Sequence, residues 1–74
     1  MTPGAAAAAE AFTERRMALG LTQSDIIRRV PISLRAVSYF ECRARWPKPA
    51  TRALLEQAVE WPPGHLTRLA EDAA

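Results

Sequence analysis

The stretch TQSDIIRRVPISLRAVSYFEC, residues 22–42, carries the local signals of two short helices separated by a tight turn. Thr22 and Ser33 are favoured N-cap residues, because a hydroxyl oxygen can accept a hydrogen bond from a free amide of the first helical turn. Pro31 has no amide hydrogen, so the first helix must end before it. We therefore predict one helix from Gln23 to about Arg29 and a second, opened by Ser33, through about Cys42.

The second of these helices has two chemically different faces. At about 100° per residue, Ala36, Val37, Phe40 and Glu41 fall on one side. The opposite side carries Arg35, Ser38, Tyr39 and Cys42, and Leu34 lies between the two at the exposed first turn. A short helix, a tight turn and a helix that presents an arginine and a tyrosine outward are typical of a DNA-reading helix pair. An ordinary solvated surface helix would carry the same residues, so the pattern alone leaves both interpretations open.

The flanking sequence predicts three more helices and no strand, since no stretch alternates polar and apolar residues. The first should run from about Ala5 to Leu19, with Phe12, Arg16 and Leu19 inward and Gly20 as its stop. Trp46, Pro47 and Pro49 enforce an extended connection, after which residues 50–60 form a fourth helix. A fifth should begin at Pro62 and Pro63. The predicted inward residues of the second, fourth and fifth helices are Ile26, Ile27, Leu54, Leu55, Ala58, Val59, Leu66 and Leu69.

The chain of 74 residues is short for a domain, so we expect one all-α domain of five helices over residues 1–74, with one small core. Its net charge is only +2, but residues 15–52 hold nine of the ten lysines and arginines and two of the eight acids, which makes that segment +7. Concentrated positive charge suggests a surface that meets a polyanion such as nucleic acid. A solvated basic face is the alternative.

Several function classes lack support in the sequence. Cys42 is the single cysteine, which excludes an internal disulfide, and it has no metal-site or catalytic spacing. His65 has no companion ligands, so a surface or capping role is expected. No carboxylate pair, Cys/His pair or phosphate-cradling glycine loop is present, and we expect no enzyme activity, cofactor, metal or small-molecule substrate. The run Ala5 to Ala9 lacks the flank and length of a signal or membrane segment, so we expect a soluble, cytoplasmic protein.

The longer stretch RMALGLTQSDIIRRVPISLRAVSYFE, residues 16–41, resembles the lambda-repressor-like helix-turn-helix family, the Cro/CI (XRE-type) class of phage and bacterial regulators. The resemblance rests on the run Gly20 to Gln23 and on Val37, Ser38 and Glu41 at the expected offsets. The segment WPKPATRALLEQAVEWPPG, residues 46–64, is similar to the family's fourth helix and its exit.

Two departures from the family pattern concern the turn. Ile27 stands where the family usually has alanine, and Pro31 stands where it usually has a glycine, often with positive φ. Proline holds φ near about −65°. The turn must therefore differ locally, and the crossing angle of the two helices could shift with it.

The resemblance implies a sequence-specific double-stranded DNA-binding transcriptional regulator, repressor or Cro-like, with residues 33–42 as the recognition helix in the major groove. It implies that Gln23 contacts a phosphate and braces a base-reading side chain, and that Leu34, Arg35, Ser38 and Tyr39 reach base edges. It places Cys42, Arg43 and Arg45 at the DNA backbone, with Ser33 and Lys48 as further candidates. It also implies a partly buried ion pair between Arg16 and Glu41. Arg28 and Arg29 are either long-range steering charges or solvated charges, and we expect the latter. Trp46 and Trp61 are expected as core or staple residues rather than as base-stacking platforms.

Alternative functions and the assembly are less determined by the sequence. An excisionase-like or architectural DNA-binding protein would bend DNA strongly with weak sequence preference. An antitoxin-type module would have the same fold but would bind a protein instead of DNA. We expect a weak homodimer on a pseudo-palindromic site, since one recognition helix covers few base pairs. Its contact is expected in the C-terminal region, with the alanine-rich N-terminus or proximity on DNA as alternatives.

Overall fold

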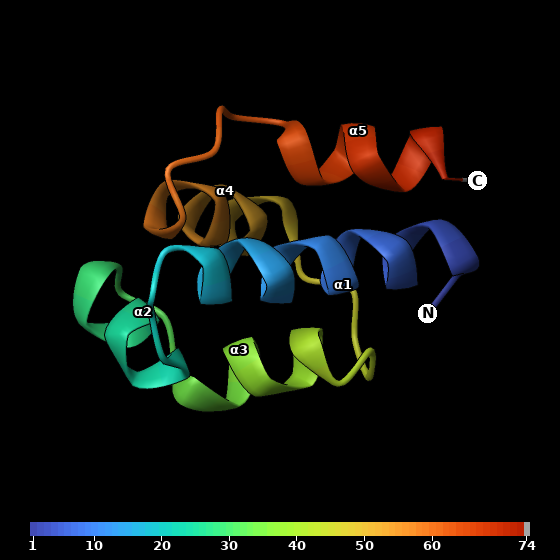
Figure 1. Ribbon diagram of the computed structural model, residues 1–74. Helices are drawn as coiled ribbons and strands as arrows, with labels where there is room; N and C mark the ends of the chain where they lie inside the picture. The colour runs from blue at the N-terminus through green and yellow to red at the C-terminus, as the bar shows by residue number, and fades with distance from the viewer. Residues whose placement is uncertain (74) are drawn as a thin grey trace.

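Five helices make up most of the chain in the computed structural model, which describes residues 1–73 (Figure 1). Within that range there is no strand, so the prediction of an all-α domain of five helices is confirmed. The helices are α1 (Pro3–Ala18), α2 (Gln23–Arg29), α3 (Leu34–Glu41), α4 (Pro49–Ala58) and α5 (His65–Asp72).

Side-chain caps fix the starts of the first three helices. Ser33 Oγ accepts a hydrogen bond from the Ala36 amide at 3.1 Å, as expected for the start of α3. Thr22 and Asp25 cap α2 reciprocally, each side chain accepting from the other's amide. Helix α1 begins at Pro3, earlier than the predicted Ala5, because Thr2 Oγ1 caps the Ala5 amide and proline suits a first turn.

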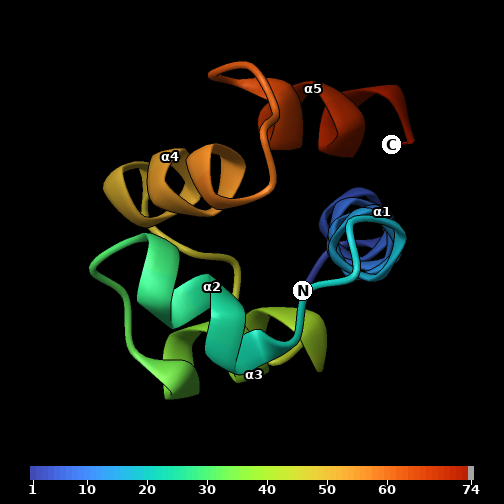
Figure 2. The same cartoon turned by 60° about the vertical axis from the view of Figure 1, so that its left-hand side comes forward.

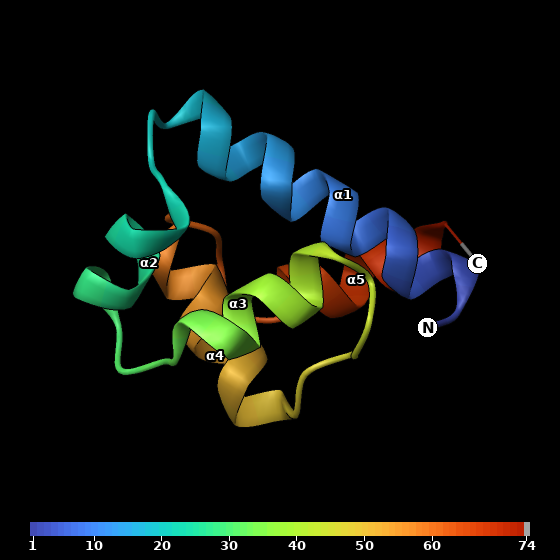
Figure 3. The same ribbon diagram turned by 90° about the horizontal axis from the view of Figure 1, so that it is seen from below.

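The helices α1 and α5 lie side by side and run antiparallel (Figures 1 and 3). Small residues of α1 make this close approach possible: Ala5, Ala8 and Ala9 are buried, and Gly4 lies so close to α5 that a Cβ atom there would collide with the Ala70 carbonyl. The alanine-rich run is therefore a packing face within the chain. Figure 2 shows α2 and α3 at the opposite end of the molecule from α5, with α4 between them.

An aromatic cluster ties the helices together. The Phe12 ring lies 5.4 Å from that of Phe40 and 6.2 Å from that of Trp61, centroid to centroid. Trp46 meets Phe40 edge-on at 6.0 Å, so both tryptophans pack against the core as predicted. The other fully buried large side chains are Ile26, Val37, Leu55, Val59 and Leu66, whereas Leu19, Ile27, Leu54 and Leu69 are only partly buried.

The turn between α2 and α3 avoids the conformation that proline forbids. The Ile32 amide donates to the Val30 carbonyl at 2.8 Å, which makes a three-residue turn centred on Pro31. The inverse form of such a turn has a negative φ at its centre, and a proline supplies it. Within residues 1–73, positive φ occurs only at Gly20, Arg43, Glu60 and Gly64. Pro31 therefore has no positive φ, as its ring requires, and the difference from the family's turn stays a prediction.

The predicted bounds of the last two helices are wrong. Helix α4 ends at Ala58 instead of residue 60, because Glu60 adopts φ 62° and closes the helix as Gly20 closes α1. Helix α5 begins at His65, and Pro62 and Pro63 lie in the preceding turn. Its cap comes from α4: the buried Glu56 carboxylate accepts from the Gly64 amide at 3.0 Å and the Leu66 amide at 2.8 Å.

His65 differs from the expectation of a surface or capping role. Its ring is partly buried and packs on the Trp61 ring at 4.5 Å. None of the helices in residues 1–73 has the length and apolar character needed to cross a membrane.

Candidate nucleic-acid interface

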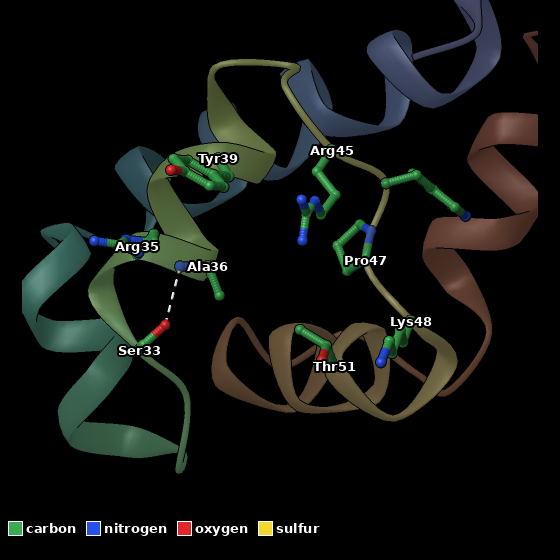
Figure 4. Close-up of a pocket in the computed structure, with 9 residues that line it drawn as sticks. Ser33, Arg35, Ala36, Tyr39, Arg45, Pro47, Lys48 and Thr51 are labelled. Atoms are coloured by element: carbon green, nitrogen blue, oxygen red, sulfur yellow. Dashed lines mark hydrogen bonds between the residues drawn. The ribbon is translucent and has the colours of Figure 1, made fainter.

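The outward face of α3 and the start of α4 enclose a groove of about 370 Å³ (Figure 4). Figure 4 shows Arg35 and Tyr39 on α3, Lys48 and Thr51 at the start of α4, and Arg45 between the two helices. Three cations and no acid line the groove, so its charge is of one sign. The lining residues are Ser33, Arg35, Ala36, Tyr39, Arg45, Trp46, Pro47, Lys48 and Thr51.

Most other arginines of the basic segment bind groups within the chain. Arg28 and Arg29 form exposed ion pairs with Asp25 and Glu60, at 3.0 and 3.4 Å. Arg29 also donates to the Ala58 carbonyl at 3.1 Å, and Arg15 donates to the Val59 carbonyl at 3.0 Å, so both stabilise the last turn of α4.

The three groove cations differ from these arginines. Arg35, Arg45 and Lys48 are exposed, and within residues 1–73 none has an acidic partner. Positive charge without an internal counter-charge is therefore concentrated along α3 and the start of α4. Such a surface attracts an external polyanion.

The expected ion pair between Arg16 and Glu41 is present behind this face. Arg16 Nε and Nη2 donate to the two Glu41 carboxylate oxygens, both at 2.8 Å, and Arg16 Nη1 donates to the Leu21 carbonyl at 2.8 Å. Both side chains are at least nine-tenths buried, at 10% and 7% exposure. The pair fixes the end of α3 against α1 and the connection to α2.

This pairing controls the ionisation of Glu41. Burial alone would raise the pKa of the carboxyl, but hydrogen bonds from Arg16 and Gln23 outweigh it and hold the pKa below its usual value. The hydrogen bonds that Arg16 donates to the Glu41 carboxylate in turn raise the pKa of Arg16. The carboxylate therefore stays charged at neutral pH and does not act as a free acid beside the groove.

Of the predicted DNA-contacting residues, the structure brings Ser33, Arg35, Tyr39, Arg45 and Lys48 together in the groove. Lys48, which the resemblance offers only as a further candidate, lines the groove beside Arg45. Leu34, Cys42 and Arg43 are exposed outside the groove, and Ser38 is half-buried.

Two predicted contacts have partners within the chain. Gln23 Nε2 donates to Glu41 Oε1 at 3.2 Å, which leaves its other amide hydrogen and its oxygen for a ligand. Arg43 adopts φ 62° at the end of α3, and its guanidinium lies 3.6 Å from the exposed Glu10 carboxylate.

Four further residues line the groove and were not predicted from the sequence: Ala36, Trp46, Pro47 and Thr51. The place of Thr51 in the groove could have been predicted, because a helix that begins near Pro49 has Thr51 in its first turn, close to Lys48. Trp46 and Pro47 had been interpreted only as core and connection. Trp46 packs against the core as expected, and both residues also line the groove.

Comparison of the chain with models of protein families, with curated proteins and with solved structures gives no match. Among residues 1–73, no three side chains of the metal-ligating types lie together in a way that could hold a metal ion.

Proposed function

We propose that this protein is a sequence-specific double-stranded DNA-binding transcriptional regulator that inserts α3 into the major groove and acts in the cytoplasm. The observation that carries the proposal is the set of cations without acidic partners, Arg35, Arg45 and Lys48, which face outward from α3 and the start of α4. The order of α2, a tight turn and α3 supports it, because this is the arrangement of helix-turn-helix readers.

The residues divide into those that reach bases and those that hold phosphates. Arg35 in the first turn of α3 offers a planar fork that fits guanine O6 and N7. The exposed Leu34 offers an apolar contact for a thymine methyl group, and Tyr39 offers a hydroxyl to a phosphate or packs on a sugar. Arg45 and Lys48 lie beyond α3 and hold the backbone.

The start of α4 adds a second phosphate contact to the proposed interface. Helix α4 has no side-chain cap and begins at Pro49, which has no amide hydrogen, so the amides of Ala50 and Thr51 and the positive end of the helix are free to face a phosphate held by Lys48. These contacts would set the register of α3 on the duplex without reading sequence.

The proposed assembly is a weak homodimer on two half-sites about 34 Å apart. Because α1 and α5 bury their small and apolar residues against each other, the proposed contact in the C-terminal region would use the outward side of α5, where Thr67, Arg68 and Glu71 are exposed. Analytical sedimentation together with DNase footprinting tests this. A strict monomer that protects a single half-site would refute it.

Selection of bound sites from a random DNA pool tests the proposed function. The expected result is an enriched sequence whose duplex is still bound in a gel shift with excess scrambled competitor. Arg28→Ala is the matched control, because Arg28 is exposed but lies outside the groove and pairs with Asp25. Binding with strong bending and no enriched sequence would favour an architectural or excisionase-like role. No DNA binding at all would favour a protein-interaction module of the antitoxin type.

A further inference from the structure

Arg52 lies in α4 and turns back toward the connection that precedes its helix. Its Nη1 donates to the Pro47 carbonyl at 2.6 Å, and its guanidinium carbon lies 5.1 Å from the centre of the Trp46 ring. Arg52 is half-buried, and it is absent from the lining of the groove. Its cation is therefore directed at the back of the connection.

These contacts join the two walls of the groove. Trp46, which Arg52 covers, meets the fully buried Phe40 of α3 edge-on at 6.0 Å. A continuous series of contacts thus runs from α4 through the connection to α3. Arg45 and Lys48 flank Trp46 and Pro47 in the chain, so the backbone that Arg52 holds determines where both groove cations project.

We propose that Arg52 is a positioning residue, which orders residues 45–48 so that Arg45 and Lys48 meet the DNA backbone while Arg52 itself touches no DNA. The inference rests on the function proposed above. It assigns to Arg52 a role in shaping the groove that differs from the role of the cations that line it.

The geometry requires the planar guanidinium and not merely a positive charge. A guanidinium can lie on the indole face and at the same time donate along its edge to a carbonyl. A lysine ammonium is a compact charge that cannot make both contacts in this arrangement. Arg52→Lys therefore separates the effect of charge from the effect of these contacts. It keeps the net charge of the protein but cannot contact the Trp46 ring and the Pro47 carbonyl at the same time.

The experiment compares the parent with Arg52→Lys, and uses Arg68→Lys on the exposed side of α5 as the matched control. Binding to a short, fluorophore-labelled duplex of mixed sequence is measured by anisotropy. In the absence of DNA, the Trp46 indole resonance and the backbone amides of residues 44–48 are followed by NMR. We expect about tenfold weaker binding for Arg52→Lys, a shifted indole resonance and no change for Arg68→Lys.

A double-mutant cycle with Arg45→Ala tests whether Arg52 acts through the groove cations. If it does, Arg52→Lys weakens binding less in the Arg45→Ala protein than in the parent. Should Arg52→Lys melt too early to study, Trp46→Phe removes the indole but keeps a ring against Phe40, and the same loss of binding is expected.

Parental affinity in Arg52→Lys, or an unchanged Trp46 indole resonance, would overturn the inference while leaving the proposed function intact. Failure of the parent to bind any duplex would instead overturn the proposed function, and the inference with it.

Discussion

Arg16 Nε lies 2.8 Å from Glu41 Oε2, and Arg16 Nη2 lies 2.8 Å from Glu41 Oε1, so one ion pair joins α1 to the last residue of α3. Removing one partner would leave the other charge buried without compensation. We expect Glu41→Ala to lower the free energy of unfolding by about 3 to 5 kcal/mol, measured by urea denaturation. Glu10→Ala, which breaks the exposed pair with Arg43, is the control and should cost less than about 1 kcal/mol. Equal, small losses in both variants would show that the Arg16 pair contributes little.

The same ion pair makes the free energy of unfolding depend on pH in the acidic range. Because the pKa of Glu41 lies below its usual value in the folded state, the stabilisation is complete above the unfolded-state pKa, at about 4.3, and is lost as pH falls through the lower, folded value. The difference in unfolding free energy between the parent and Glu41→Gln should therefore shrink as the pH falls through the range below about 5. A difference that stays constant across this range would contradict the assigned ionisation.

The close approach of α1 and α5 makes Gly4 sensitive to any side chain. A Cβ there would collide with the Ala70 carbonyl, so Gly4→Ala should destabilise the protein by about 1 to 3 kcal/mol. Thermal unfolding measures this. Gly20→Ala is the comparison: its added methyl meets nothing within 4 Å, and its cost, about 1 kcal/mol, arises only from the positive φ of 72°. An unchanged melting temperature for Gly4→Ala would mean that α1 and α5 are not packed as described.

Glu56 should behave as a cap for α5. Its carboxylate accepts the Gly64 and Leu66 amides, so Glu56→Ala should cost about 1 to 3 kcal/mol and speed amide exchange in α5. Glu56→Gln keeps one acceptor oxygen and should lose less. Equal losses in the two variants, with exchange in α5 unchanged, would show that the carboxylate does not hold this helix.

The sequence predicted the parts of the fold that local chemistry determines. Thr22, Ser33 and Pro31 act within a few residues of themselves, so the bounds of α2 and α3 were predictable, and so was the absence of a positive φ at Pro31. The start of α5 was missed because its cap is a side chain from α4, for which the sequence around Pro62 gives no sign.

In the candidate site, too, contacts between residues far apart in the sequence could not be predicted. Charge along the chain placed the cations between residues 15 and 52, but only the folded structure separates those with partners, such as Arg29 with Glu60, from those without, such as Arg45. These partners are far apart in the sequence. Periodicity and composition could not have paired them.

Arg35 and Arg45 occupy different places on the proposed interface. Arg35 lies in the first turn of α3, whereas Arg45 lies beyond the end of that helix, beside the connection to α4 (Figure 4). Arg35→Ala should weaken binding to the selected site by about 1 to 3 kcal/mol and relax preference at one base pair. Arg45→Ala should weaken all sequences alike and reduce the salt slope by roughly one.

The most direct test of the proposed function is the affinity of Arg35→Ala for the selected and scrambled duplexes, measured across a salt series beside Arg45→Ala. DNA reading by α3 predicts that Arg35→Ala loses more affinity for the selected duplex than for the scrambled one. An equal loss on both duplexes would make Arg35 a backbone contact and would contradict the assignment of α3 as the recognition helix.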